Sequence, residues 1–293
     1  MKIIVTIPAY NEEETIAEVI SGIHDVMTKS HYNYKILVLD DGSKDKTAEV
    51  ARKNKAIVFS HQYNRGLAET FKTEIKESIS LGADLIIHID ADSQYLPTDI
   101  PKLIEKYKEG YDLVLGSRFL GTIEEMPFVK KLGNRMFSAV ISKILNFRIT
   151  DAQTGFRAFS KKVATELDIR STHTYTQEQI IKAVKNRFRI AEVPIYFAKR
   201  KSGESRLIKN PFEYAAKAGI NILRLFRDYE PLKFFGIIGG LIFSIGFIIG
   251  AWLLYLFLTL GKVGHTPSLI LSILLLIVGI QIILFGLFAD MRR

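Results

Sequence analysis

The sequence of 293 residues contains no cysteine and a single tryptophan. Without cysteine, the protein cannot form a disulfide, bind zinc through thiolates or use a thiol as a nucleophile. Histidine is also scarce, and no pair of histidines shows the spacing of a metal site. These absences leave carboxylates, hydroxyls, amides and basic side chains as the groups that could carry chemistry.

Charge is missing from two long stretches, Phe234–Leu260 and Ser268–Ala289. As helices they would reach roughly 40 and 33 Å, at about 1.5 Å per residue. The hydrocarbon core of a bilayer is about 30 Å thick. We therefore expect a transmembrane hairpin over residues 231–293, with these two stretches as its spans.

The basic excess of the chain is confined to one region. The formal net charge is +9, but residues 1–181 carry −1, residues 182–230 carry +7 and residues 231–293 carry +3. A nucleic-acid-binding domain usually spreads its basic residues over one face, whereas this excess adjoins the expected membrane segment. We therefore expect no nucleic acid as partner, and attraction to anionic headgroups or to a phosphorylated lipid instead.

The same counting predicts the orientation of the hairpin. Basic residues flank its two outer ends and are Arg224, Arg227, Lys233, Arg292 and Arg293. Between the spans lie only Lys262 and His265. The positive-inside rule therefore puts both termini, and the water-exposed part of the chain, in the cytoplasm.

Over the first 120 residues, β-branched runs alternate with helical periods. The strand-like runs are Lys2–Ile7, Tyr34–Asp40, Ala56–Ser60, Asp84–Asp90 and Asp112–Gly116. The helices predicted between them cover 12–29, 45–54, 65–81 and 97–109. The first helix has Asn11 and Glu14 in capping-box spacing. This alternation predicts an α/β fold, a mostly parallel sheet with helices on both faces.

Residues 121–230 are less regular. The patterns there predict a helix over Phe128–Leu145, a loop at Thr150–Gly155, a helix near Gln177–Asn186 and a strand pair around Arg189–Phe197. An amphipathic pattern runs from Phe212 to Phe226, typical of a helix in the membrane interface or of a core helix. We expect three parts: a domain at 1–209, an interfacial helix at 210–230 and the hairpin.

Three of the predicted strands end in acidic or turn-forming residues: PAYNE at 8–12, DDGS at 40–43 and DADSQ at 90–94. Each run alone could be an ordinary turn or helix cap. In a parallel sheet, however, all three would meet at the edge where ligands bind. Carboxylates gathered there would repel one another unless a cation neutralised them.

Asp90 and Asp92 could both reach one hard divalent cation, with Gln94 offering a further oxygen. Mg²⁺ or Mn²⁺ held in this way would act as a Lewis acid on a departing nucleoside diphosphate. Acidic residues such as Asp40 suit hydrogen bonds to a base or ribose, and Tyr10 suits stacking. Neither a Walker motif nor G-x-G-x-x-G follows the first strand, which disfavours a P-loop NTPase or a dinucleotide dehydrogenase.

These runs, with GSR at 116–118 and TDAQTGFR at 150–157, resemble the motifs of inverting glycosyltransferases of family 2. Within that family they are most similar to polyprenyl-phosphate (dolichyl-phosphate) hexosyltransferases. The resemblance covers about residues 1–210. It implies a GT-A fold, a divalent metal, a nucleotide-sugar donor (GDP-mannose, UDP-glucose or UDP-N-acetylglucosamine) and a polyprenyl phosphate in the membrane as acceptor.

The resemblance also implies roles for individual residues. The donor would be held by Pro8, Tyr10, Glu12, Val38, Asp40, Asp41, Ala91 and Arg118. The metal would be held by Asp90, Asp92 and Gln94. Asp92, Arg118 and Glu178 would be catalytic, with Arg118 facing the phosphates and Glu178 standing where many members keep a base. The alternative for Glu178 is an acidic residue in the first turn of a helix.

The acceptor phosphate would be bound by basic residues in the second half of the chain. Residues 200–206 match the family pattern R-x-x-G-x-S-K, with Arg206 in place of the usual lysine. The candidates are Lys130, Lys131, Arg135, Arg200 and Arg206. The alternative is a solvated basic cluster beside lipid headgroups.

Two other functions compete with lipid glycosylation. The protein could be a membrane-anchored glycosyltransferase for a protein or polysaccharide acceptor, or a nucleotide-sugar-binding protein without activity. The sequence leaves open the sugar, the choice between Mg²⁺ and Mn²⁺, the polyprenol length and the oligomeric state.

Overall fold

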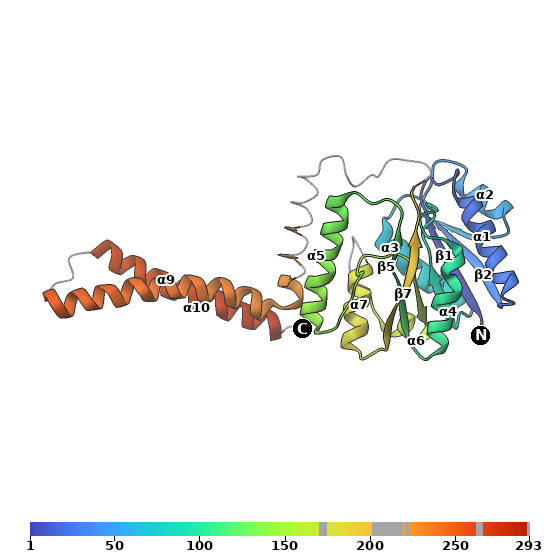
Figure 1. Cartoon of the computed structure of the whole chain (residues 1–293). Coiled ribbons are helices and arrows are strands. Elements are labelled where there is room, and N and C mark those ends of the chain that lie inside the picture. The colour runs from blue at the N-terminus through green and yellow to red at the C-terminus, as the bar shows by residue number, and fades with distance from the viewer. Residues whose placement is uncertain (170–174, 201–218, 221–222, 225, 262–265, 292–293) are drawn as a thin grey trace. The chain divides into compact units, whose positions relative to one another are not determined.

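The computed structural model describes residues 1–169, 175–200, 219–220, 223–224, 226–261 and 266–291. The chain divides into two compact units, Met1–Pro211 and Phe212–Arg293. Figure 1 shows the elements of both units, coloured along the chain.

The first unit is built on a seven-stranded sheet with the order β3-β2-β1-β4-β6-β5-β7. Neighbouring strands are parallel, except that β6 runs antiparallel to both β4 and β5. The strands are β1 (Ile3–Ala9), β2 (Tyr34–Asp40), β3 (Ile57–Ser60), β4 (Leu85–His88), β5 (Leu113–Ile123), β6 (Arg157–Ser160) and β7 (Ile190–Phe197). The mostly parallel sheet predicted from the sequence is confirmed.

Two strands differ from the sequence prediction. The strand pair expected around Arg189–Phe197 is a single strand, β7, which pairs in parallel with β5. Strand β6 was not predicted, because its run RAFS is short and carries a charged residue. All four side chains of β6 are nevertheless buried, and Arg157 is fully enclosed. Hydrophobic periodicity cannot reveal a central strand that buries an arginine.

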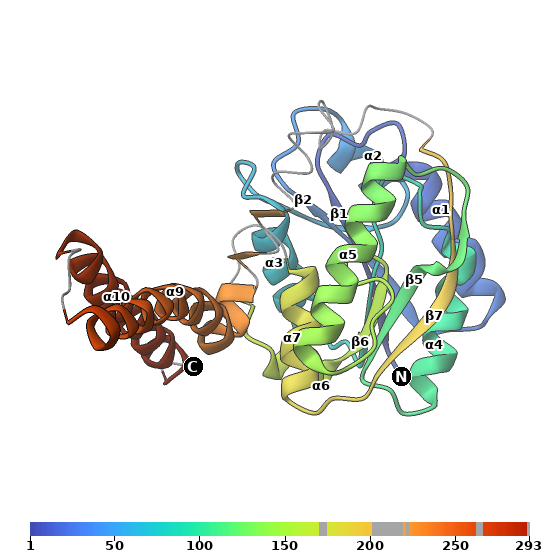
Figure 2. The same ribbon diagram turned by 60° about the vertical axis from the view of Figure 1, so that its left-hand side comes forward.

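Helices cover both faces of this sheet (Figure 2). Since successive strand residues point to opposite faces, Val5 joins the core formed with α1 and α4, while Thr6 contacts α3 on the other side. The helices are α1 (Ile16–Lys29), α2 (Thr47–Lys53), α3 (Leu67–Ser80), α4 (Ile100–Lys108), α5 (Phe128–Leu145), α6 (Lys161–Glu166) and α7 (Thr176–Lys185), with the short 3₁₀ helix η1 (Pro97–Asp99) before α4.

The capping box predicted at the first helix is wrong. Helix α1 begins at Ile16, and no side chain caps it. Asn11 takes a left-handed backbone conformation, with φ of 54°. Its side-chain oxygen accepts the N–H of Lys44 at 2.8 Å, and its own N–H donates to Ser43 Oγ at 2.9 Å. Asn11 therefore joins the loop after β1 to the loop after β2.

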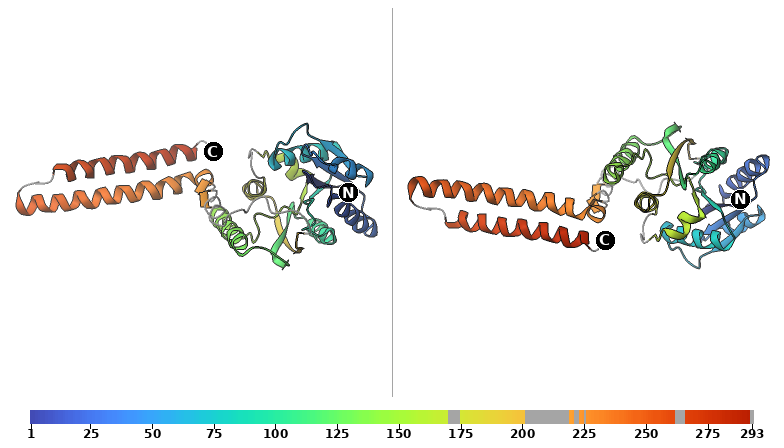
Figure 3. Two further views of the ribbon diagram at one scale, coloured as in Figure 1. Left: turned by 90° about the horizontal axis from the view of Figure 1, so that it is seen from above. Right: turned by 90° about the horizontal axis from the view of Figure 1, so that it is seen from below.

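The second unit contains two long helices, α9 (Pro231–Leu260) and α10 (Thr266–Met291), which lie side by side as a hairpin (Figure 3). Both are long and apolar enough to cross a membrane, judged by length and composition. Before α9, the described residues 219–220, 223–224 and 226–229 are helical. Most of the segment 212–226 lies outside the described residues, so the amphipathic helix there stays a prediction.

Glycines allow α9 and α10 to approach closely. A Cβ added at Gly239 would lie 2.6 Å from the carbonyl oxygen of Gly279, and one at Gly279 would lie 2.8 Å from that of Gly239. Gly246 and Gly286 are also buried between the helices. In lipid, helices associate through such close packing because the surrounding chains are as apolar as the side chains.

We expect Gly239→Leu to push the two helices apart and Gly240→Leu to be tolerated, because a Cβ at Gly240 would meet nothing within 4 Å. Overpacking of this kind costs about 1–3 kcal/mol. The measurement is the fraction of purified protein in detergent that stays monodisperse in size-exclusion chromatography after heating. Equal heat resistance of the two variants would contradict the close contact at Gly239.

Candidate active site

The loops after β1, β2 and β4 meet at one edge of the sheet. The backbone N–H of Asp41 donates to the carbonyl of Ala9 at 2.9 Å and so connects the first two loops. After β4, the hydroxyl of Tyr95 accepts the N–H of Gly155 at 3.1 Å. Because β6 runs antiparallel, the loop 150–156 before it reaches the same edge as the ends of the parallel strands.

Asp90 and Asp92 lie at this edge with partly exposed carboxylates. The Asp90 carboxylate lies against Gly155, where an added Cβ would be only 2.8 Å from Asp90 Oδ2. Asp92 accepts the N–H of Gln94 through Oδ1 at 3.1 Å and pairs with Arg200 through Oδ2. Burial and the charge of Asp90 raise the pKa of Asp92 above its usual value, although Arg200 opposes them. A bound cation would relieve the repulsion between the two carboxylates.

This pair of carboxylates fits a divalent metal whose other coordinating atoms come from a bound ligand. Across the described residues, no three histidine, aspartate or glutamate side chains gather as a metal-binding group. Mg²⁺ commonly uses only one or two protein carboxylates when phosphate oxygens complete its coordination. Asp90 and Asp92 supply that number. Gln94 lies beside them, its Nε2 donating to the carbonyl of Ala198 at 3.4 Å.

Arg118 is held by Asp151 in a buried two-bond pair. Its Nε donates to Asp151 Oδ2 at 2.7 Å and its Nη2 to Oδ1 at 2.8 Å. Glu192 of β7 positions this aspartate by accepting the N–H groups of Thr150 and Asp151 at 2.9–3.0 Å. Arg118 is only 5 % exposed, and its pairing with Asp151 fixes the position of the guanidinium at this edge. Its contact with donor phosphates stays a prediction.

Asp41 is engaged by the loop after β3. Its Oδ1 accepts the N–H of Arg65 at 2.9 Å and lies 2.7 Å from Nδ1 of His61, while its Oδ2 accepts the N–H of Gly66 at 2.9 Å. The sequence pattern does not point to this loop, because the run HQYNRG at 61–66 contains no acidic residue. Asp41 therefore fixes the position of the loop after β3 against the loop after β2.

The remaining residues predicted to bind the donor differ in exposure. They are Pro8, Tyr10 and Glu12, which are partly exposed, and Val38, Asp40 and Ala91, which are buried. Val38 is fully buried and lies in the sheet between β1 and β3, so the structure does not support its predicted contact with a nucleoside. Asp40 accepts the N–H of Ser43 at 3.0 Å and thereby closes the turn after β2.

One of the predicted acceptor cations contacts a carboxylate, and a second lies within electrostatic range of the pair. Arg200 pairs directly with Asp92. Lys130, at the start of α5, is close enough for the charges of Arg118 and Arg200 to affect it. Burial and then these two cations lower the pKa of Lys130, while Asp92 acts in the opposite direction.

For Lys131 and Arg135, both among the described residues, no such contact with the carboxylates is seen. Arg135 lies over the ring of Phe119, with its guanidinium carbon 5.2 Å from the ring centroid. Lys131 is partly exposed on α5. Arg206 lies outside the described residues. Phosphate binding by these three residues stays a prediction.

Glu178 lies in the first turn of α7 and is buried. Its carboxylate pairs with Lys182, one turn later, at 2.7 Å. The helix dipole favours an acidic side chain at this position. The ion pair accounts for Glu178 without a catalytic role, and its action as a base stays a prediction.

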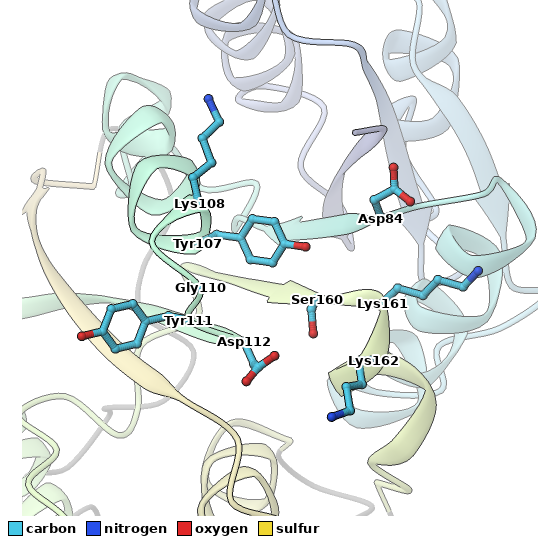
Figure 4. A pocket seen from close by; sticks show the side chains of 9 residues that line it. All are labelled: Asp84, Tyr107, Lys108, Gly110, Tyr111, Asp112, Ser160, Lys161 and Lys162. Atoms are coloured by element: carbon cyan, nitrogen blue, oxygen red, sulfur yellow. The ribbon is translucent and has the colours of Figure 1, made fainter.

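A hollow of about 520 Å³ lies at the other edge of the sheet (Figure 4). It is lined by residues that precede β4 and β5, such as Asp84 and Asp112, and by Ser160 at the end of β6. In open α/β sheets, ligands bind at the carboxyl ends of the strands. We therefore place the active site at Asp90 and Asp92.

Comparison with known proteins decides the family. Residues 4–168 match the model of glycosyl transferase family 2. The chain belongs to this family. It is a glycosyltransferase, and the resemblance noted from its motifs is confirmed.

This glycosyltransferase is similar to two archaeal enzymes. It is 35% identical over 213 residues to the UDP-N-acetylglucosamine–dolichyl-phosphate N-acetylglucosaminyltransferase of Methanococcus voltae, a match covering 64% of this chain and 82% of that protein. It is 32% identical over 293 residues to the dolichol-phosphate mannosyltransferase of Pyrococcus furiosus, covering 94% of this chain and 78% of that protein.

Among solved structures, the glycosyltransferase is similar to glucosyl-3-phosphoglycerate synthase from Mycobacterium tuberculosis in complex with Mn²⁺, UDP-glucose and phosphoglyceric acid. The TM-score is 0.61, the identity is 23%, and the match covers 77% of this chain and 78% of that one. This likeness shows the fold, which is GT-A-like as the sequence predicted.

We expect Asp151→Ala to destabilise the glycosyltransferase by about 3–5 kcal/mol, because it leaves the guanidinium of Arg118 buried without its partner. The control is Glu125→Ala, which breaks the exposed ion pair with Lys199 and should change stability little. Both are measured by denaturant unfolding of the full chain in detergent. Equal unfolding midpoints would show that Arg118 does not depend on Asp151.

Proposed function

We propose that this glycosyltransferase transfers a hexose, with inversion, from a nucleotide sugar to a polyprenyl phosphate at the cytoplasmic face of the membrane. The observation that carries the proposal is the ion pair between Arg200 and Asp92, next to the second carboxylate, Asp90. Carboxylates that share a metal suit a donor diphosphate, and adjacent cations suit a second phosphate. The names of both archaeal relatives specify dolichyl phosphate, which supports this class of acceptor.

Asp90 and Asp92, with Gln94, are the residues that would hold Mg²⁺ or Mn²⁺. Either ion, when bound, stabilises the charge of a departing nucleoside diphosphate as a Lewis acid. The solved neighbour that contains Mn²⁺ and UDP-glucose supports a divalent ion in this role. The loops after β1 and β2 would hold the nucleoside through Pro8, Tyr10, Glu12, Asp40 and Asp41, with Ala91 beside them.

The acceptor phosphate requires positioning more than deprotonation. A phosphate monoester has a second pKa near 6 and is largely a dianion at neutral pH. One of its oxygens bonds to the anomeric carbon as the bond to the diphosphate breaks, and the electron pair leaves with the nucleoside diphosphate. Cations must offset the repulsion between the two phosphates. Those proposed are Lys130, Lys131, Arg135, Arg200 and Arg206. Glu178 need not act as a base.

A transfer assay separates this function from its alternatives. Membranes containing the protein are incubated with polyprenyl phosphate and radiolabelled GDP-mannose, UDP-glucose or UDP-N-acetylglucosamine, then extracted with organic solvent. Label in the lipid phase supports the proposal and identifies the donor. Label in protein or polysaccharide supports a different acceptor, and no transfer supports a binding protein without activity.

We expect Asp92→Ala to lower transfer by at least two orders of magnitude, because it removes a carboxylate that would hold the metal. Such a loss corresponds to about 2.7 kcal/mol of transition-state stabilisation. Asp25→Ala, on an exposed position of α1, serves as the control and should behave as wild type. Unchanged turnover in EDTA would contradict the metal assignment.

The proposed orientation is tested by cysteine labelling of intact cells. A cysteine at Lys262, in the connection between the two spans and outside the described residues, should react with an impermeant thiol reagent. A cysteine at Ser43 should not react, because the catalytic unit would be cytoplasmic. The native chain has no cysteine and therefore no background. The opposite labelling pattern would overturn the orientation.

A further inference from the structure

A chain of buried polar side chains runs behind Asp90. His88, Glu74 and Thr6 are fully buried, and the function proposed above uses none of them. Glu74 Oε2 accepts the hydroxyl of Thr6 at 3.0 Å and lies 2.7 Å from Nδ1 of His88. On the other side of the ring, His88 Nε2 lies 2.6 Å from the hydroxyl of Tyr175 and 3.5 Å from Oδ1 of Asp90.

Stability alone does not account for this arrangement. A buried ionisable pair is often no more stabilising than apolar side chains of the same size. Glu74 also leaves its second oxygen, Oε1, without a hydrogen-bond partner in the part of the chain that the structure describes. Such a buried acceptor is costly. Apolar residues at positions 74 and 88 would fill the same space without that cost.

The surrounding residues fix the ring of His88 with Nε2 toward the hydroxyl of Tyr175, and Asp90 Oδ1 also lies near this nitrogen, at 3.5 Å. Phe71 of α3 packs edge-on against this ring at 5.6 Å between centroids and stacks on Tyr175 at 3.7 Å. Glu74, from the same helix, contacts the opposite nitrogen. Asp90 follows the end of β4 and is therefore no longer held by the sheet ladder. Its carboxylate is confined by the ring of His88 on one side and by the backbone of Gly155 on another.

We propose that His88 is a positioning residue for Asp90, whose carboxylate its ring holds in the orientation that binds the divalent cation. The proposal rests on the metal site of the proposed function. Glu74 and Tyr175 fix the ring in turn. Groups that orient metal-binding carboxylates typically change metal affinity by about 10–100-fold when they are removed.

Asparagine and glutamine at position 88 separate the two ends of the ring. The amide nitrogen of asparagine falls near the place of Nδ1, facing Glu74, whereas that of glutamine reaches the place of Nε2, facing Asp90. Both variants are neutral, so they differ in position and not in charge. We expect the Kd for Mn²⁺ of the full chain, measured by EPR of the free ion, to rise about tenfold or more in His88→Asn. In His88→Gln it should stay closer to the wild-type value.

His24 offers a matched control, because it makes a similar contact away from the carboxylates. Its Nδ1 lies 2.7 Å from the hydroxyl of Tyr34, and its Nε2 lies 3.2 Å from the carbonyl of Asn54. His24→Asn should leave the Kd for Mn²⁺ unchanged. Thermal unfolding of each variant shows that the compared proteins are folded.

A second measurement keeps the native residue and so does not depend on how well the asparagine variant folds. In protein labelled with ¹⁵N-histidine, Mg²⁺ should shift the ring signals of His88, which are identified by their absence from His88→Gln. The signals of His24 should stay in place. Ring signals of His88 whose chemical shifts did not change on addition of Mg²⁺ would overturn the proposal.

The Kd values distinguish a positioning role from a structural one. Equal values in wild type, His88→Asn and His88→Gln would overturn the proposal. Weaker Mn²⁺ binding by His88→Gln than by His88→Asn would also overturn it. In that case the contact of His88 with Glu74, and not its contact with Asp90, would matter for the metal. A wild-type protein that transferred sugar without binding Mn²⁺ would refute both the metal site and the role of His88. Mn²⁺ binding without transfer to polyprenyl phosphate would refute the proposed acceptor and leave the role of His88 standing.

Discussion

Two like charges at the end of one central strand impose the constraint on which the site depends. Asp90 and Asp92 are close enough that the charge of the first raises the pKa of the second. Cations from two other segments lie near this pair of carboxylates: Lys130 in α5 and Arg200 after β7. Residues that follow β5 and β7 thus place positive charge near the carboxylates that follow β4. The result is an edge where anions of high charge can approach one another.

The first half of the fold could be predicted because local and long-range signals agree there. Apolar runs bounded by turn residues became β1, β2 and β4, and the acidic loops behind them converged as expected. Prediction failed where a residue acts through tertiary contacts. Arg157 interrupts the apolar pattern of β6 yet is fully buried, and Asn11 resembles a helix cap but bridges two loops. Sequence spacing carries no information about either contact.

Much of the candidate site could be predicted from the sequence, but the buried residues that hold it in place could not. Asp90 and Asp92 stand out because acidic or turn-forming runs follow three predicted strands, whose ends meet at one edge of a parallel sheet. His88 does not, since a single histidine in such a strand looks like any core residue. Its partner Glu74 lies on the helical pattern of α3 as an ordinary polar position, and only packing shows that it is buried. Val38 was assigned by its place in a motif, which does not show that its side chain points into the core.

The antiparallel pairing of β6 with β4 determines which residue lies against Asp90. His88 pairs with Arg157 in antiparallel register, so Asp90, two residues after His88, comes to lie against Gly155, two residues before Arg157. A slip of one residue would bring a bulkier neighbour against Asp90 and turn every side chain of β6 to the other face. Insertions and deletions near Gly155 are therefore far less tolerable than side-chain replacements in the surrounding core. Backbone hydrogen bonds between β4 and β6 set the distance between Asp90 and Gly155. This distance therefore does not depend on which side chains surround the two residues.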